Sequence, residues 1–441
     1  MRQHALSQGV RVTQGVRLLG LGGLVLLLSG CGLFYNHTLS YEDFSLYGNQ
    51  PKTTLRRTGD TIQDVFDAYR LLFPNFEEKV HGARILYEED SLSQENIFTG
   101  DLRQEGFYLP VLDLIHLSPR RPRGDADDLS VILHEMAHHF LISAHSKTSS
   151  QYWLNEGLAC CLEVSFFDEE GTLCTPLFHQ SLFSQARRIL RRDGEEKFRS
   201  ELSALIGASW FHFHRSDGRN HNYAYSWSLY WHLLNQQEGS LEERVHAIIE
   251  MSPPEVLASI DGVISDLRTS ADDHLAALSK DPDLRGWCLE RWAELPAANG
   301  RRFRAALLEE LDPERDPGPK SWARATLLIN GRIRGISRQE RNLLHRRVAK
   351  TLGSPDTDLN IRIAIAAALA DEGSLSWAYI VPLINGLEEA SGELRAASAR
   401  ALARLSKQKP TVVNPGFWRN APPEIRAVEV AEWRNWYELR H

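Results

Sequence analysis

The segment LHEMAHHF, residues 133–140, constrains this chain most, because it places His134 and His138 four positions apart with Glu135 between them. On an α-helix, residues i and i+4 differ by only about 40° around the axis, so both imidazoles project from one face and can share a metal ion. A carboxylate beside them can take a proton from water that the metal activates. His139 is rotated by about 100° from His138, so we expect it to pack or cap.

A catalytic zinc site needs three protein ligands and one open position, so the fold must bring a third ligand to this helix. A metzincin would have Gly at position 141 and His at position 144, where this chain has Leu141 and Ala144. No Asp or Glu occurs between His138 and Glu156. Glu156 itself lies in WLNEGLACCLE (153–163), an apolar stretch of helical period.

The phrase NEGLA puts Glu156 18 positions after His138. This pair of motifs resembles the gluzincin peptidases, whose second zinc-binding helix carries an N-E-G-x-A-like phrase about 17 to 20 residues beyond H-E-x-x-H. The resemblance covers roughly residues 60–240. It implies that His134, His138 and Glu156 bind Zn²⁺ and that Glu135 is the general base in hydrolysis of a peptide bond. The G-x-M-E-N phrase of the aminopeptidase branch is absent, so exopeptidase action has no support.

The segment HNYAYSWSLYWHLL (221–234) resembles the stretch after the metal helices in peptidase-MA-like gluzincins. In these proteins a Tyr three residues before a small residue opens a helix and points into the cleft. Matching this phrase implies that Tyr223 stabilises the oxyanion, with Ser226 as the small residue. Tyr225 and His221 are alternatives, and all three aromatic side chains could instead serve packing alone.

Cys160 and Glu163 lie four and seven residues beyond Glu156 and share its helical face, so either could contact a metal ligand from behind. A Cys160 thiolate bound directly to the metal would close the open position, which we do not expect because His, His and Glu already form a catalytic set. A disulfide from Cys160 or Cys161 to Cys174 is possible. With Cys288, only four cysteines follow position 31, too few for a disulfide scaffold in a chain of 441 residues.

Three arginines precede the apolar run LLGLGGLVLLL (18–28), which is short and glycine-rich for a membrane-spanning helix. The run ends in LSGC (28–31), which resembles the lipobox of bacterial lipoproteins. We therefore expect residues 1–30 to be a signal peptide and Cys31 to be lipidated. The mature protein would be anchored in the cell envelope on the extracytoplasmic, periplasmic side. The alternative is a buried helix that ends at a chance cysteine.

The rest of the chain divides into three parts. Residues 31–60 are polar and turn-rich, which predicts a tether or a strand between anchor and body. Residues 61–274 combine helical and strand-like patterns, which predicts an α+β fold and, by the resemblance, a gluzincin-like domain. Residues 275–441 have almost only helical patterns and predict an all-α domain.

Four segments carry the pattern of the α+β part. Residues 61–76 and 125–143 have helical spacing, residues 83–89 have the pattern of a strand, and residues 106–118 alternate as two short strands. The strand just before the H-E-x-x-H helix matches the place where gluzincins have an edge strand that pairs with an extended substrate. An ordinary core strand is the alternative.

Two alanine-rich stretches in the last part, residues 360–373 and 393–408, repeat an R-x-A phrase about 33 residues apart. They resemble HEAT-type helical repeats, which bind protein partners. A helical bundle packed on the first domain is the alternative.

Charge excludes one class of function. The formal net charge is −8 and basic residues are interspersed with acidic ones, which argues against nucleic-acid binding. Two other functions stay open for the metal site: a catalytically silent scaffold that works through its helical repeats, and a metal hydrolase of a non-peptide bond.

Overall fold

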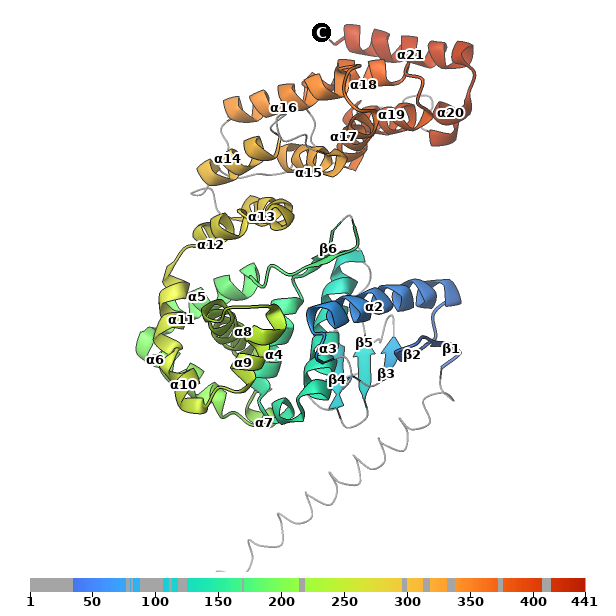
Figure 1. Cartoon of the computed structure of the whole chain (residues 1–441). Coiled ribbons are helices and arrows are strands. Elements are labelled where there is room, and N and C mark those ends of the chain that lie inside the picture. The colour runs from blue at the N-terminus through green and yellow to red at the C-terminus, as the bar shows by residue number, and fades with distance from the viewer. Residues whose placement is uncertain are drawn as a thin grey trace, which may run out of the picture. The chain divides into compact units, whose positions relative to one another are not determined.

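The computed structural model describes residues 35–76, 80, 82–87, 106–110, 113–117, 125–168, 170–213, 219–295, 300–311, 318–330, 338–371, 376–406 and 414–440. Residues 1–30 and Cys31, for which the sequence predicts a signal peptide and a lipid anchor, lie outside these residues. The chain forms two compact units, Met1–Thr269 and Ser270–His441, whereas the sequence places the division after residue 274. The described chain is mostly helical with a small mixed sheet (Figure 1), which agrees at this coarse level with an α+β fold.

The main sheet of the first unit has five strands. They are β1 (His37–Ser40), β2 (Phe44–Gly48), β3 (Ala83–Tyr87), β4 (Gly106–Leu109) and β5 (Leu114–Leu117). Their order is β1-β2-β3-β5-β4, with β2, β3 and β5 parallel and with β1 and β4 as antiparallel edge strands. The predicted strand at 83–89 and the predicted pair of strands within 106–118 are confirmed.

Residues 31–60, predicted to be a tether or a strand, contribute β1, β2 and the start of helix α2 (Lys52–Leu72). The described part of this segment therefore follows the strand alternative, and it also contains the first residues of a helix. In β2, the buried Phe44 and Leu46 alternate with less buried residues, and Leu55 is fully buried in the first turn of α2. A few apolar side chains at strand and helix spacing therefore fold this polar segment onto the body.

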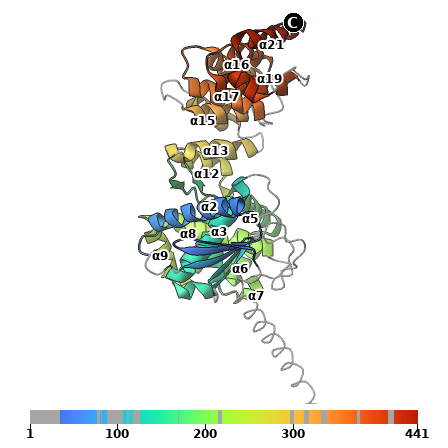
Figure 2. The ribbon, with the colours of Figure 1, turned by 90° about the vertical axis from the view of Figure 1, so that its right-hand side faces the viewer.

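Helices α2 and α3 (Asp125–Ala144) cover the sheet: α2 packs on β1 and β2, and α3 packs on β4 and β5 (Figure 1 and Figure 2). The two helices also contact each other through aromatic rings, with Phe66 and Phe140 5.6 Å apart between ring centroids. The buried hydroxyl of Tyr69 donates a hydrogen bond to the carbonyl of Leu133, at 2.7 Å. This contact fixes α3 one residue before the H-E-x-x-H motif.

Helix α4 (Tyr152–Leu162) packs on α3 and crosses α8 (Arg219–Gln236). Gly157 makes this close crossing possible, because a Cβ atom there would lie 2.6 Å from Cβ of Tyr230 and 2.9 Å from the carbonyl oxygen of Ser226. The glycine of the NEGLA phrase therefore has a packing role. The other elements of the unit are η4 (Ser146–Ser150), β6 (Phe166–Phe167), β7 (Leu173–Cys174), α5 (Gln180–Asp193), α6 (Glu195–Ile206), α7 (Trp210–Phe213), α9 (Leu241–Ile249), α10 (Pro253–Ala258) and α11 (Ile260–Arg268).

The second unit is helical throughout its described residues. Its elements are α12 (Ala271–Leu278), α13 (Pro282–Glu294), α14 (Gly300–Glu310), α15 (Pro319–Asn330), α16 (Arg338–Gly353), α17 (Leu359–Asp371), η7 (Trp377–Tyr379), α18 (Ile380–Gly386), α19 (Gly392–Ser406), α20 (Pro415–Asn420) and α21 (Pro423–Glu438). Alternate helices pack together, α15 with α17 and α17 with α19 in one row, and α16 with α18 in another. Among the described residues, no helix is both long enough and apolar enough to span a bilayer.

The arginines of the repeated R-x-A phrase are both buried and both donate to carbonyl groups, although Arg362 also pairs with the carboxylate of Glu389, at 2.6 Å. Arg362 of α17 donates to the carbonyl of Leu352, at 3.0 Å. Arg395 of α19 donates to four carbonyl oxygens, at 2.6 to 2.9 Å: two in the turn before α19 and two in the last turn of α20. Each guanidinium satisfies carbonyl groups that a helix end leaves without partners, so the phrase recurs for a structural reason.

Candidate metal centre

Three predicted ligands from two helices converge on one point. The Nε2 atoms of His134 and His138, on α3, lie 3.4 Å and 3.5 Å from the same oxygen, Oε2 of Glu156 on α4. All three ligand atoms lie within 4.8 Å of one another. In a tetrahedral zinc site with bonds of about 2.1 Å, ligand atoms are about 3.4 Å apart. The donor set and its spacing therefore fit a single zinc ion.

The other ring nitrogen of each histidine has its own partner. Nδ1 of His134 lies 2.7 Å from Oε2 of Glu163, and Nδ1 of His138 lies 2.9 Å from Oδ1 of Asn155. The second carboxylate oxygen of Glu163 contacts Nε2 of His179, the residue that caps α5. Such partners fix the ring orientation, here with Nε2 of each imidazole facing Glu156.

The sequence anticipates some of these partners and misses others. Glu163 shares a helical face with Glu156, which marks it in advance as a possible contact. Asn155 is part of the NEGLA phrase, but its contact with His138 depends on how α4 packs on α3. His179 follows no motif, because only the tertiary fold brings the start of α5 to Glu163.

Electrostatics favour a cation at this point. Burial alone would lower the pKa of His134, but hydrogen bonds to Glu156 and Glu163 raise it well above its usual value. Burial would also lower the pKa of His138, but the negative charge of Glu156 and a hydrogen bond to it raise this pKa above its usual value. Burial alone would raise the pKa of Glu163, but hydrogen bonds from His134 and His179 lower it to about 2. The carboxylates thus hold positive charge on the imidazoles, and a metal cation would meet the same field.

Glu135 occupies a position unlike that of the ligands. It is 5% exposed, and its Oε2 atom has no hydrogen-bond partner among the described residues. Burial raises the pKa of its carboxyl group. Strand β4 passes directly over it, since a Cβ atom on Gly106 would lie 2.8 Å from both Cγ and Oε1 of Glu135. A buried carboxylate oxygen without a partner is costly for stability, which is typical of a group retained for chemistry.

The three candidates for an oxyanion donor lie in different surroundings. The ring of Tyr223, at the start of α8, is 6.5 Å from the ring of His134 between centroids. Tyr225 packs on Phe198, at 4.9 Å between ring centroids, and burial raises its pKa to about 12. His221 lines a separate pocket beside α5. Tyr223 is thus the one of the three whose ring contacts a predicted ligand.

The remaining candidates near the centre take packing or supporting positions. Nδ1 of His139 lies 3.3 Å from the hydroxyl of Tyr108, away from Glu156, as expected for a packing residue. Cys160 forms a second potential metal group with His134 and Glu163, within 4.8 Å, and burial raises the pKa of its thiol well above the usual value. The possible disulfide is not formed. The four cysteines of the described chain are buried free thiols: Cys160, Cys161, Cys174 and Cys288.

Comparison with known proteins adds no assignment: no protein-family model and no curated protein sequence matches this chain. The interpretation of the centre therefore depends on its residues and their geometry.

Proposed function

We propose that this chain is a zinc metallopeptidase of the gluzincin type, anchored by a lipid on Cys31 to the extracytoplasmic side of a cell-envelope membrane. The observation that carries the proposal is the convergence of His134, His138 and Glu156, whose ligand atoms lie within 4.8 Å of one another, beside the buried Glu135. Two imidazoles and one carboxylate are the ligand set of catalytic zinc sites that keep a position open for water or substrate. The substrate is a peptide or protein.

A zinc ion held by these three ligands would polarise the scissile carbonyl and activate water for attack. Glu135 accepts the proton that the attacking water loses and passes it to the leaving amine. Its raised pKa suits both steps, because a group that is too acidic would not take the proton. Tyr223 donates a hydrogen bond to the oxyanion that forms at the carbonyl.

Strand β4 is proposed to align the substrate. It is the last strand in the order of the sheet, and its first residue, Gly106, packs against Glu135. An extended peptide can add to such an edge through main-chain hydrogen bonds. The scissile bond would then pass close to the general base.

The helical second unit supports a further part of the proposal. Its two rows of alternating helices and the buried, carbonyl-binding Arg362 and Arg395 favour a HEAT-like repeat. This unit would bind a protein partner or a protein substrate. A catalytically silent scaffold that acts through this unit is the second candidate function.

The proposal is tested with the purified full-length chain and a peptide library. We expect about one zinc per chain, cleavage of a subset of the peptides, loss of cleavage after chelation and recovery on addition of zinc. Zinc binding without cleavage of any peptide or protein would favour the scaffold. Cleavage that resists complete removal of zinc would contradict the mechanism.

A further inference from the structure

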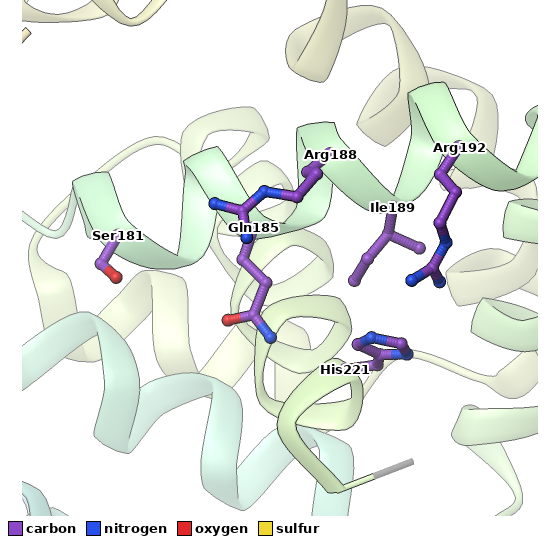
Figure 3. Close-up of a pocket in the computed structure, with 6 residues that line it drawn as sticks. All are labelled: Ser181, Gln185, Arg188, Ile189, Arg192 and His221. Atoms are coloured by element: carbon purple, nitrogen blue, oxygen red, sulfur yellow. The ribbon is translucent and has the colours of Figure 1, made fainter. Parts of the chain in front are cut away.

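A pocket of about 240 Å³ opens between α5 and the start of α8, outside the metal centre. Six side chains line it: Ser181, Gln185, Arg188, Ile189, Arg192 and His221. The first five belong to one stripe of α5. Figure 3 shows the side chains of Gln185 and Arg192 reaching from that helix toward the level of His221 on α8, whereas Arg188 extends along the helix above Gln185. Ile189, the apolar member of the lining, is buried.

The lining carries donors and positive charge, and its described residues include no carboxylate. Arg192 is already paired, because its guanidinium binds both oxygens of Asp193, at 2.6 Å and 2.8 Å. Arg188 is exposed and forms no ion pair with any described residue. A guanidinium, an amide, a hydroxyl and an imidazole around one cavity are the groups that bind a carboxylate.

Two features connect the pocket with the metal centre. Ser181, at one end of the stripe, is two residues after His179, which contacts Glu163. His221, on the other wall, is two residues before Tyr223, whose ring contacts His134. His221 and Tyr223 both lie in α8, where residues i and i+2 point in nearly opposite directions, so the pocket is not part of the centre.

We propose that this pocket is a subsite that binds a carboxylate of the substrate, either an acidic side chain or a chain terminus. This assignment rests on the proposed peptidase function. From Ser181 to Arg192 the stripe is about 16 Å long, given a rise of 1.5 Å per helical residue. An extended peptide rises about 3.3 Å per residue, so the stripe has the length of about five residues of a bound peptide, which sets the range of positions that the test covers.

The test uses the full-length zinc-loaded protein and amidated peptides that share one cleavable core. A Glu is moved over five positions on each side of the scissile bond, with a matched Gln peptide at each position. A further peptide without Glu has a free C-terminal carboxylate. Arg188→Gln removes the unpaired charge of the pocket, and Arg191→Gln, an exposed arginine of the same helix that does not line the pocket, is the control.

We expect kcat/KM to be about tenfold higher for the Glu peptide than for the Gln peptide in at least one register, as for a charge-assisted hydrogen bond. Arg188→Gln should abolish this preference, whereas Arg191→Gln should keep it. A preference limited to the free C-terminus would identify the terminal carboxylate as the ligand. No preference in the wild type, or a preference that survives Arg188→Gln, would overturn the assignment.

A failure of the peptidase proposal can be distinguished from a failure of the pocket assignment. If no peptide is cleaved, the same Glu and Gln peptides are titrated calorimetrically into wild type and Arg188→Gln. Tighter binding of a Glu peptide to the wild type only would support the pocket and reject the peptidase. Equal binding by both proteins would overturn the pocket as well.

Discussion

The contact between Glu163 and His134 gives a prediction that requires no substrate. Oε2 of Glu163 lies 2.7 Å from Nδ1 of His134, and its other oxygen contacts His179. With Glu163 replaced by Ala, the imidazole loses the acceptor that keeps Nε2 directed at Glu156. We therefore expect the protein to fold and to bind zinc more weakly.

The size of the effect follows from the role of this contact. Loss of a partner that orients a metal-bound imidazole typically weakens metal affinity about 10–100-fold, or about 1.4–2.7 kcal/mol. Glu163→Ala removes both the hydrogen bond and the charge, so it should reach the upper part of this range. Glu163→Gln keeps an acceptor for His134 and loses only the charge, so it should stay near the lower end.

The assay is a competition titration with a chromophoric chelator at one fixed pH, which gives the dissociation constant for zinc. Circular dichroism and a thermal melt verify that each variant is folded. Glu201→Ala, which removes an exposed carboxylate on α6, is the control and should bind zinc as the wild type does. An unchanged affinity in folded Glu163→Ala would refute the claim that Glu163 orients His134 for metal binding.

Three further predictions concern stability. Arg395→Met leaves four carbonyl acceptors without a guanidinium, so it should lower the free energy of unfolding of the second unit by about 3–5 kcal/mol in urea denaturation. The control Arg400→Met changes an exposed arginine of the same helix and should have little effect. Gly157→Ala places a methyl group 2.6 Å from an atom of α8 and should destabilise the fold by about 1–3 kcal/mol in thermal unfolding. The control Gly207→Ala meets no atom within 4 Å and should be tolerated, so equal melting temperatures for the two variants would contradict the close crossing of α4 and α8. Burial, and then the charge of a nearby arginine, lower the pKa of His345 to about 4, so the unfolded chain binds a proton that the folded chain does not. Stability should therefore be complete above about pH 6.5 and fall as the pH decreases toward 4, and a His345→Gln variant with the same pH profile would exclude this cause.

The sequence predicts the core of the candidate centre well because local geometry determines much of it. Two histidines four residues apart share a helical face in any α-helix, and the structure has that helix in α3. Glu156 approaches both histidines because α4 packs on α3, which the motif spacing alone does not dictate. The glycine of the NEGLA phrase serves a different contact, since Gly157 permits the crossing of α4 and α8.

What the sequence misses depends on contacts between distant segments. The sequence leaves open whether residues 31–60 form a tether or a strand, because β1 and β2 are only four and five residues long and mix polar with apolar side chains. His179 lies outside every motif and acquires its role only when α5 reaches Glu163. The pocket beside α5 requires two helices to face each other, so the sequence of α5 alone does not show that its stripe becomes one wall of a cavity.

The central claim is that Glu135 acts as the general base of hydrolysis at a zinc site without being a ligand of the zinc ion. Its most direct test measures zinc content and peptide turnover side by side for the wild type and Glu135→Gln, both purified as full-length protein. The Gln side chain keeps the shape of Glu135 but cannot accept the proton. We expect about one zinc per chain in both proteins and a loss of turnover of about 10²–10⁴-fold in the variant. Equal turnover by the two proteins at equal zinc content would contradict the account.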